Sequence, residues 1–243
     1  MHGIYNILTL DKGSKNMKIK NLIFDVDGTL WDSSSSVAAS WNRVLQRYDE
    51  TKHIHLTQQD EYRFMGHTMT EIAEMMLPGL PDARRTEIMD ACMADENAYL
   101  MSHPGEFYDG LSDTWKVLHR SGKNLYIVSN CQDGYIQAML TGGHFTYEEA
   151  ADGGIVPRDI QDFECFGRTG KKKGDNIKIL MDRNGLIAEE TVYIGDTEMD
   201  ETAAREAGVR FIHATYGFGT AKAPDAVIHD IRELPNCIKN QIL

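Results

Sequence analysis

The chain has 243 residues, of which 42% are hydrophobic, and its formal net charge is −12 at pH 7. This length allows one ordinary hydrophobic core and a modest second unit, and the hydrophobic content argues against a disordered chain. Binding to a nucleic-acid backbone requires a concentrated excess of Lys and Arg, so the acidic charge argues against a nucleic-acid partner.

The first part of the chain contains a polar segment and then a strand. Residues 1–16 are polar and contain glycine, and we expect them to form a tail or extension ahead of Met17. The apolar run from Ile19 to Phe24 predicts a short buried strand. It ends at once in Asp25 to Thr29, a polar loop that contains the turn residue Gly28.

Residues 33–105 have a different pattern, with helical periodicity and no convincing strand. Thr68 and Glu71 have the spacing of a capping box, which marks the start of a helix. We therefore expect an all-helical cap at residues 33–105, inserted into an α/β core formed by residues 17–32 and 106–243. One amphipathic face in this segment consists of Trp41, Val44, Leu45 and Tyr48.

Three later apolar runs predict further buried strands of one sheet. Each is preceded or followed by a segment with helical character, and two of the helical patterns end at Gly122 and Gly185, which we interpret as C-terminal caps. This alternation predicts an α/β fold with a Rossmann-like parallel sheet flanked by helices. The runs are Leu125–Val128, Val192–Ile194 and Val209–Ile212.

Polar residues follow the predicted strands at the edge where open parallel sheets bind ligands. Because the carboxyl ends of parallel strands meet at that edge, we expect these side chains to converge on one point. They are Asp25 and Asp27 after the first strand, Ser129 and Asn130 after the second, and Asp196 with Asp200 after the third.

The acidic residues of this set predict a metal site. Asp25 and Asp27 would repel one another in a crevice unless a divalent cation neutralised them. Mg²⁺ suits such a set because it binds a few carboxylates, keeps some waters and accepts phosphate oxygens. Asp196 and Asp200 lie near one another if a helix begins between them. One of the two is a candidate for direct metal binding, and we assign Asp200 a supporting role.

The remaining polar residues of the set predict an anion site. The Ser129 hydroxyl and the amides around Asn130 are suited to phosphate oxygens if a helix begins there. A lysine ahead of the helix that starts near Gly174 would neutralise a phosphoryl group, and we select Lys173 over its neighbours Lys171 and Lys172. Three adjacent lysines are also typical of a solvated surface patch.

These residues also form a recognisable set of motifs. Asp25-Val26-Asp27-Gly28-Thr29-Leu30 resembles the first motif of the haloacid dehalogenase-like hydrolases in its phosphatase form, with Gly28 and Thr29 as supporting residues. Ser129-Asn130 resembles the second motif, and the segment from Gly195 to Asp200 resembles the fourth. The third motif departs from the pattern, because the phosphoglycolate phosphatase-like group usually has Lys-Pro where this chain has Lys173-Gly174. The helical insertion lies where that group carries its cap.

The resemblance implies a Mg²⁺-dependent phosphatase that acts on a small organic phosphate monoester. It implies that Asp25 attacks phosphorus to form an aspartyl phosphate and that Asp27 transfers the proton. Mg²⁺ would be bound by Asp25, the main-chain oxygen of Asp27, and Asp196. Ser129, Asn130 and Lys173 would hold the phosphoryl oxygens.

Two other functions remain open at this stage. A sugar phosphomutase, similar to β-phosphoglucomutase, would use the same residues around phosphorus, whereas dehalogenases lack an aspartate at the position of Asp27. A non-catalytic binding module would keep the fold, but the motifs are complete. The cap residues Arg63, His67 and Met69 surround Gly66 and are candidates for substrate contacts or ordinary helix and loop positions.

The location and partners follow from simpler features. The four cysteines show no paired metal-ligand spacing, and no apolar run reaches the roughly 18 residues of a membrane span. We therefore expect a reduced, cytoplasmic protein whose partner is a small phosphorylated metabolite, with no membrane partner. No sequence feature indicates an oligomeric state. The cysteines are Cys92, Cys131, Cys165 and Cys237.

Overall fold

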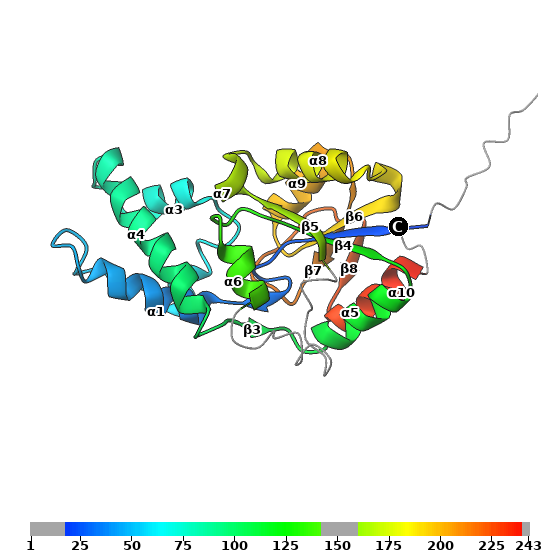
Figure 1. Ribbon diagram of the computed structural model, residues 1–243, viewed down its shortest axis with the longest axis horizontal. Helices are drawn as coiled ribbons and strands as arrows, with labels where there is room; N and C mark the ends of the chain where they lie inside the picture. Colours follow the sequence, from blue (N-terminus) through cyan, green and yellow to red (C-terminus); the bar gives the residue numbers. More distant parts are fainter. Residues whose placement is uncertain (1–17, 142–159, 240–243) are drawn as a thin grey trace, which may run out of the picture.

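The computed structural model describes residues 18–141 and 160–239, so the expected tail at residues 1–16 lies outside the described residues. Its centre is a six-stranded sheet in the order β5-β4-β1-β6-β7-β8, in which every neighbouring pair is parallel. The parallel α/β fold predicted from the sequence is confirmed (Figure 1). The strands are β1 (Asn21–Phe24), β4 (Asn124–Ser129), β5 (Ile160–Cys165), β6 (Thr191–Gly195), β7 (Arg210–Ala214) and β8 (Ala226–Ile228).

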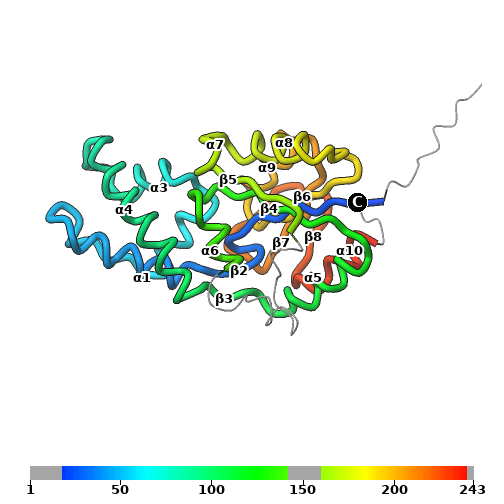
Figure 2. The backbone as a smooth tube through the Cα atoms, viewed as in Figure 1, coloured from blue at the N-terminus to red at the C-terminus, as the bar shows by residue number. Residues whose placement is uncertain are grey.

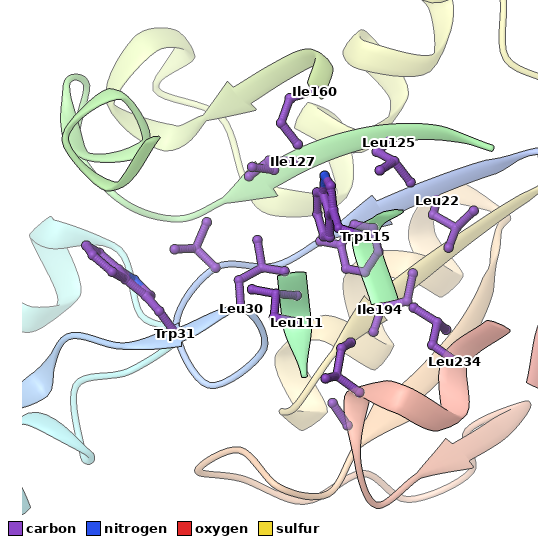
Figure 3. Close-up of a cluster of buried hydrophobic side chains, with 14 of the residues drawn as sticks. Leu22, Leu30, Trp31, Leu111, Trp115, Leu125, Ile127, Ile160, Ile194 and Leu234 are labelled. Carbon is purple, nitrogen blue, oxygen red and sulfur yellow. The ribbon is translucent and has the colours of Figure 1, made fainter. Parts of the chain in front are cut away.

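Alternate side chains of the strands point to opposite faces of the sheet, and each face is covered by helices. On one face Leu22 and Phe24 of β1 pack in a cluster with Trp115 and Leu234, which come from helices far apart in the sequence (Figure 3). On the other face Ile23 packs with residues of α8 and α9. Figure 1 accordingly places α5 (Leu111–Arg120) and α10 (Leu234–Lys239) on one side of the sheet and α8 (Lys173–Asn184) with α9 (Glu198–Ala207) on the other.

The predicted ends of two of these helices are confirmed. Gly122 follows α5 with φ of 72°, and Gly185 caps α8 with φ of 63°. This left-handed conformation is nearly free of steric cost for glycine, so these positions end the helices and turn the chain back towards the sheet. Among the described residues, no helix combines the length and apolar composition that crossing a bilayer requires.

The segment from residue 33 to residue 105 contains four helices with a hydrophobic cluster of their own. Its buried members include Trp41, Phe64 and Ile88, and the cluster extends from Val37 to Cys92. Figure 2 shows the backbone of this segment at one end of the molecule, beside the sheet. The expected capping box of Thr68 and Glu71 is present at the start of α3. The helices are α1 (Ser34–Leu45), α2 (Gln58–Glu61), α3 (Met69–Met76) and α4 (Asp82–Leu100).

Two short strands join this helical segment to the sheet. β2 (Trp31–Asp32) pairs antiparallel with β3 (Glu106–Phe107) where the chain leaves and re-enters the neighbourhood of β1. This pairing holds both connections side by side, next to the loop that follows β1. The helical segment is therefore anchored beside the carboxyl ends of the strands. The remaining short helices are α6 (Tyr135–Thr141), α7 (Phe166–Thr169), η3 (Ala188–Glu190) and η4 (Ile231–Glu233).

Candidate functional site

The central strands bring the predicted polar residues together at one edge of the sheet. β1 lies between β4 and β6 with Phe24 beside Ile127 and Ile194, so the residues that follow these strands are neighbours. Asp25 follows β1, Ser129 ends β4 and Asp196 follows β6. Asp25, Ser129 and Asp196 are all buried, and burial of the two carboxylates is unusual without compensating charge.

Lys173 supplies a positive charge to this group. Its Nζ atom lies 2.9 Å from Oδ1 of Asp25 and 2.6 Å from Oδ1 of Asp200, and its side chain is only 4% exposed. Burial by itself would lower the pKa of Lys173, but the two carboxylates outweigh it and raise the pKa. Lys171 and Lys172 are exposed. The structure thus brings Lys173, and neither neighbour, into the cluster.

Close packing of two helices explains why glycine follows Lys173. A Cβ atom added to Gly174 would lie 2.5 Å from Oε2 of Glu206 and 3.3 Å from the carbonyl oxygen of Ala203. Helices α8 and α9 therefore approach closely at this point. This contact accounts for a glycine at position 174.

Three carboxylates converge beside the lysine. Asp25, Asp196 and Asp200 each place an oxygen within 4.8 Å of the others. Burial, then the neighbouring carboxylates, raise the pKa of Asp25 to about 7 and the pKa of Asp196 well above its usual range. Oδ1 of Asp196 is buried without a hydrogen-bond partner. A buried acceptor with no donor, among carboxylates that repel one another, fits a divalent cation.

Asp200 serves mainly to hold the loop after β6. Its Oδ2 atom accepts hydrogen bonds from the amide of Asp196 (3.2 Å), the amide of Thr197 (3.0 Å) and the Thr197 hydroxyl (2.7 Å). Its Oδ1 atom faces Lys173. α9 begins at Glu198, between Asp196 and Asp200, as the four-residue spacing requires. Both Asp200 oxygens are therefore engaged by the protein, which fits the expectation of a supporting role.

Glycine is required where the loops approach Asp196. Gly28 has φ of 79°, and a Cβ atom there would lie 2.3 Å from Oδ2 of Asp196. A Cβ atom at Gly217 would lie 2.5 Å from the same oxygen, which accepts the amide of Phe218 at 2.7 Å. Thr29 accepts the Tyr216 hydroxyl at its main-chain oxygen (3.0 Å). The Gly28-Thr29 pair thus shapes the loop that carries Asp27.

Asp27 is held by three side chains that the sequence reasoning did not identify. Its Oδ1 atom accepts hydrogen bonds from Tyr135 (2.6 Å), Ser33 (2.9 Å) and the indole nitrogen of Trp31 (3.0 Å). None of these bonds uses Oδ2. Burial raises the pKa of Asp27 although the three donors oppose that shift. Trp31 and Ser33 lie four and six residues after Asp27, a local signal, whereas Tyr135 becomes a neighbour only through the fold.

Asn130 makes a contact that differs from the expected one. Its Nδ2 atom donates to the carbonyl oxygen of Gly66 at 2.8 Å, and so joins β4 to the loop between α2 and α3. α6 begins only at Tyr135, so no helix N-terminus lies at Asn130, and that part of the expectation is wrong. The reason is a turn at residues 131–134, in which the amide of Cys131 donates to the Ser129 hydroxyl at 3.4 Å.

A pocket of about 50 Å³ opens above these residues. Its wall combines residues from the strand ends with residues from the helical segment, including Asp25, Asp27, Ser129, Asn130 and Lys173 on the first side. His67 and Met69 line it on the other side, together with Gly66. Arg63 does not line this pocket and instead pairs with Asp60 on the surface. Two buried glutamates, Glu61 and Glu96, also line it and were not anticipated.

Comparisons with known proteins agree with this geometry. A family model described as haloacid dehalogenase-like hydrolase matches residues 22–214. A protein of Pseudomonas fluorescens (strain Pf0-1) named phosphoglycolate phosphatase is 27% identical over 233 residues, which cover 89% of this chain and 79% of that protein. A protein of Pseudomonas aeruginosa named phosphoglycolate phosphatase 1 is 26% identical over 229 residues, which cover 89% of this chain and 78% of that protein.

Solved structures share the fold. A crystal structure described as a predicted phosphatase from Clostridium acetobutylicum superimposes with a TM-score of 0.74 at 20% identity and covers 92% of this chain and 99% of that one. A haloacid dehalogenase-like family protein from Streptococcus pneumoniae gives a TM-score of 0.70 at 20% identity, and the match covers 90% of this chain and 97% of that one. At this level of identity, the likeness concerns the fold alone.

Proposed function

Because the chain belongs to the haloacid dehalogenase-like hydrolases, we propose that it is a phosphoric monoester hydrolase which forms a phosphoaspartyl intermediate on Asp25. The observation that supports this most strongly is the placement of Asp25. Its carboxylate is buried against Lys173, lies beside Asp196, and lines a pocket that also contains Asp27. A nucleophile, a cation and a proton donor thus surround one small space.

In the proposed reaction an oxygen of Asp25 attacks phosphorus while the bond to the leaving oxygen breaks. The leaving alcohol takes a proton, and water then attacks the phosphorus of the aspartyl phosphate and releases inorganic phosphate. Lys173 lies 2.9 Å from Asp25 and is buried, so its charge acts at short range on the transferred phosphoryl group. Ser129 and Asn130 line the same pocket, and the Ser129 hydroxyl and the main-chain amide of Asn130 are the proposed further contacts of the phosphoryl oxygens.

Asp27 is the proposed acid and base. Its raised pKa favours a protonated carboxyl group, which is the form that protonates a leaving oxygen. Once it has given up this proton, the carboxylate accepts one from the attacking water. Because Tyr135, Ser33 and Trp31 all bind Oδ1, the orientation of the carboxyl group is fixed and Oδ2 remains for the exchange.

Asp25, Asp196 and the main-chain oxygen of Asp27 are the proposed ligands of Mg²⁺. The unpartnered Oδ1 atom of Asp196 and the convergence of three carboxylates support this assignment. When bound, Mg²⁺ would neutralise negative charge on the carboxylates and on the phosphoryl oxygens.

The domain division follows the same proposal. We take residues 17–32 and 106–243 as the catalytic core and residues 33–105 as the cap. The separate hydrophobic cluster of α1 to α4 supports this division, and so does the pairing of β2 with β3 at the junction. The cap residues that line the pocket would contact the leaving group and exclude water.

The proposal is tested by measuring phosphate release from a panel of small phosphomonoesters with and without Mg²⁺. We expect release that stops when EDTA removes the metal and returns when Mg²⁺ is added back in excess. Release that is unaffected by EDTA would contradict the metal assignment. A folded protein that releases no phosphate, but interconverts isomers of a sugar phosphate, would indicate a phosphomutase instead.

Replacing Tyr135 with phenylalanine tests the orientation of Asp27. The hydroxyl donates a 2.6 Å hydrogen bond to a carboxylate, and such bonds contribute about 1.5–3 kcal/mol. We expect kcat to fall by roughly 10- to 100-fold with KM little changed. The matched control is Tyr99→Phe, because that ring stacks on His103 and does not line the pocket. Equal kcat values for the two variants would contradict the role of Tyr135.

A further inference from the structure

Three side chains that line the pocket each have a buried oxygen atom with no hydrogen-bond partner. The three atoms are Oε1 of Glu61, Oδ1 of Asn130 and Oε1 of Gln132. The orientation of the two amides is fixed by their nitrogens, since Asn130 donates to the Gly66 carbonyl and Gln132 donates to Oδ1 of Asn97 at 3.1 Å. Oδ1 of Asn130 and Oε1 of Gln132 are therefore acceptors, and Glu61 adds a carboxyl oxygen. A buried acceptor without a donor is costly, so this wall favours a ligand rich in N–H or O–H groups.

Two of the side chains on this wall are carboxyl groups. Glu61 is 1% exposed and Glu96 is 2% exposed, and both line the pocket. Oε2 of Glu96 accepts the indole N–H of Trp41 at 2.5 Å. Burial, then the charge of Glu96, raise the pKa of Glu61 to about 9, and burial raises the pKa of Glu96 to about 7. Two carboxyl groups that are costly to ionise in the empty pocket would be stabilised as carboxylates by a bound cation.

Few cations in the pocket compete for these groups. Among the described residues that line it, the basic side chains are Lys173 and His67. Lys173 is engaged by Asp25 and Asp200. Nδ1 of His67 lies 3.7 Å from a carboxylate oxygen of Glu71. Neither Lys173 nor His67 forms an ion pair with Glu61 or Glu96. A leaving group with a carboxylate would therefore face two carboxyl groups and no basic side chain paired with them.

The size and the apolar part of the wall limit the ligand further. A volume of about 50 Å³ admits a few water-sized groups, since one water needs roughly 10–15 Å³ by the same measure. Trp41 and Phe64 line the pocket with ring centroids 6.3 Å apart. Aromatic faces next to carboxylates attract ammonium groups. A short, positively charged group therefore fits this part of the site, which continues past His67, Asn130 and Lys173 into a larger pocket of about 590 Å³.

We infer that the preferred substrate is a phosphomonoester of a small amino alcohol, whose ammonium group binds Glu61 and Glu96 in the cap-side pocket. This inference rests on the proposed phosphatase function. It differs from what the names of the curated relatives would suggest, because phosphoglycolate carries a carboxylate, which the carboxylates of Glu61 and Glu96 would repel. Glu61 is then a specificity-determining residue. It lies on α2, which has no part in the motifs around phosphorus.

The test compares three esters of similar size in the presence of Mg²⁺. They are 2-aminoethyl phosphate, its neutral isostere propyl phosphate, and phosphoglycolate. We expect kcat/KM to be highest for 2-aminoethyl phosphate, at least about tenfold above propyl phosphate, and lowest for phosphoglycolate. In Glu61→Gln the ratio of kcat/KM for the amino ester to kcat/KM for propyl phosphate should fall by about tenfold. Glu74→Gln, an exposed glutamate on α3 outside this pocket, is the matched control and should keep the original order.

The outcomes distinguish a failure of the substrate inference from a failure of the proposed phosphatase function. If phosphoglycolate is hydrolysed as well as or better than the amino ester, the inference about the substrate is wrong and the phosphatase function stands. The inference is also wrong if Glu61→Gln, still folded, keeps the full preference for the amino ester over propyl phosphate. If none of the three esters releases phosphate while an activated ester such as p-nitrophenyl phosphate does, the inference about the substrate is wrong and the phosphatase function stands. If that ester is also inert, both proposals fail.

Discussion

Replacing Asp25 with asparagine lowers the rate of phosphate release by at least about four orders of magnitude, because the amide cannot form the covalent intermediate. Asparagine has nearly the same shape as aspartate and removes one of three buried carboxylates that repel one another. We therefore expect the variant to fold and to bind the ester. The measurement is phosphate release under saturating Mg²⁺ and ester, with circular dichroism to verify the fold.

The control for this variant is Asp113→Asn. Asp113 is 85% exposed on α5 and lies outside the pocket, so its replacement should leave the rate unchanged. If folded Asp25→Asn keeps more than about one hundredth of the native rate, Asp25 is not the nucleophile. A water molecule would then have to attack the ester directly.

Replacing Lys173 with methionine has a large effect on both activity and stability. The lysine neutralises Asp25 and Asp200 in a buried site, and removing one partner of a buried ion pair costs about 3–5 kcal/mol. We expect the free energy of unfolding, measured with urea in the presence of EDTA, to fall by that amount. The EDTA excludes stabilisation by bound metal, which would otherwise mask the loss. We expect kcat to fall by about 10²-fold or more, because the charge at the phosphoryl group is lost.

Lys172→Met is the matched control, since Lys172 precedes Lys173 in the chain and is exposed. Its replacement should change the free energy of unfolding by less than about 0.5 kcal/mol. Equal effects of the two substitutions would show that the cluster of lysines acts as a surface patch. That result would contradict the buried ion pairs of Lys173.

The parts of the fold that the sequence predicts are those with strong local signals. The strands β1, β4, β6 and β7 are continuous apolar runs because both faces of the sheet are covered by helices. β5, at the edge of the sheet, was missed because Ile160–Cys165 contains the adjacent polar residues Gln161 and Asp162 and so shows neither a continuous apolar run nor strict alternation. β8 was missed because it has only three residues. Edge strands and very short strands carry too little pattern to be distinguished from loops.

The candidate site divides in the same way. The residues at the strand ends were predicted because sequence motifs and the geometry of parallel sheets place them together. The direct contact between Nζ of Lys173 and Oδ1 of Asp200, at 2.6 Å, could be found only from the structure. Tyr135, which holds Asp27, is separated from it by 108 residues along the chain. No local pattern connects two such positions.

The buried glutamates of the cap could not have been predicted. Glu61 lies in a four-residue helix rich in polar residues, and Glu96 lies in α4, whose surface is largely charged. Charged residues in such segments are normally solvated. Their burial results from the approach of the cap to the strand ends. The substrate preference inferred here therefore depends on the tertiary structure.

The most direct test of the central claim is to trap the phosphoryl group on the protein. The enzyme is mixed with ester and Mg²⁺ and quenched during turnover, and any acyl phosphate is reduced with borohydride and located by mass spectrometry of peptides. The account predicts that the aspartyl phosphate is converted to homoserine at position 25 and at no other aspartate, and that Asp25→Asn gives no such product. Homoserine at another position, or none during demonstrated turnover, would contradict the covalent mechanism.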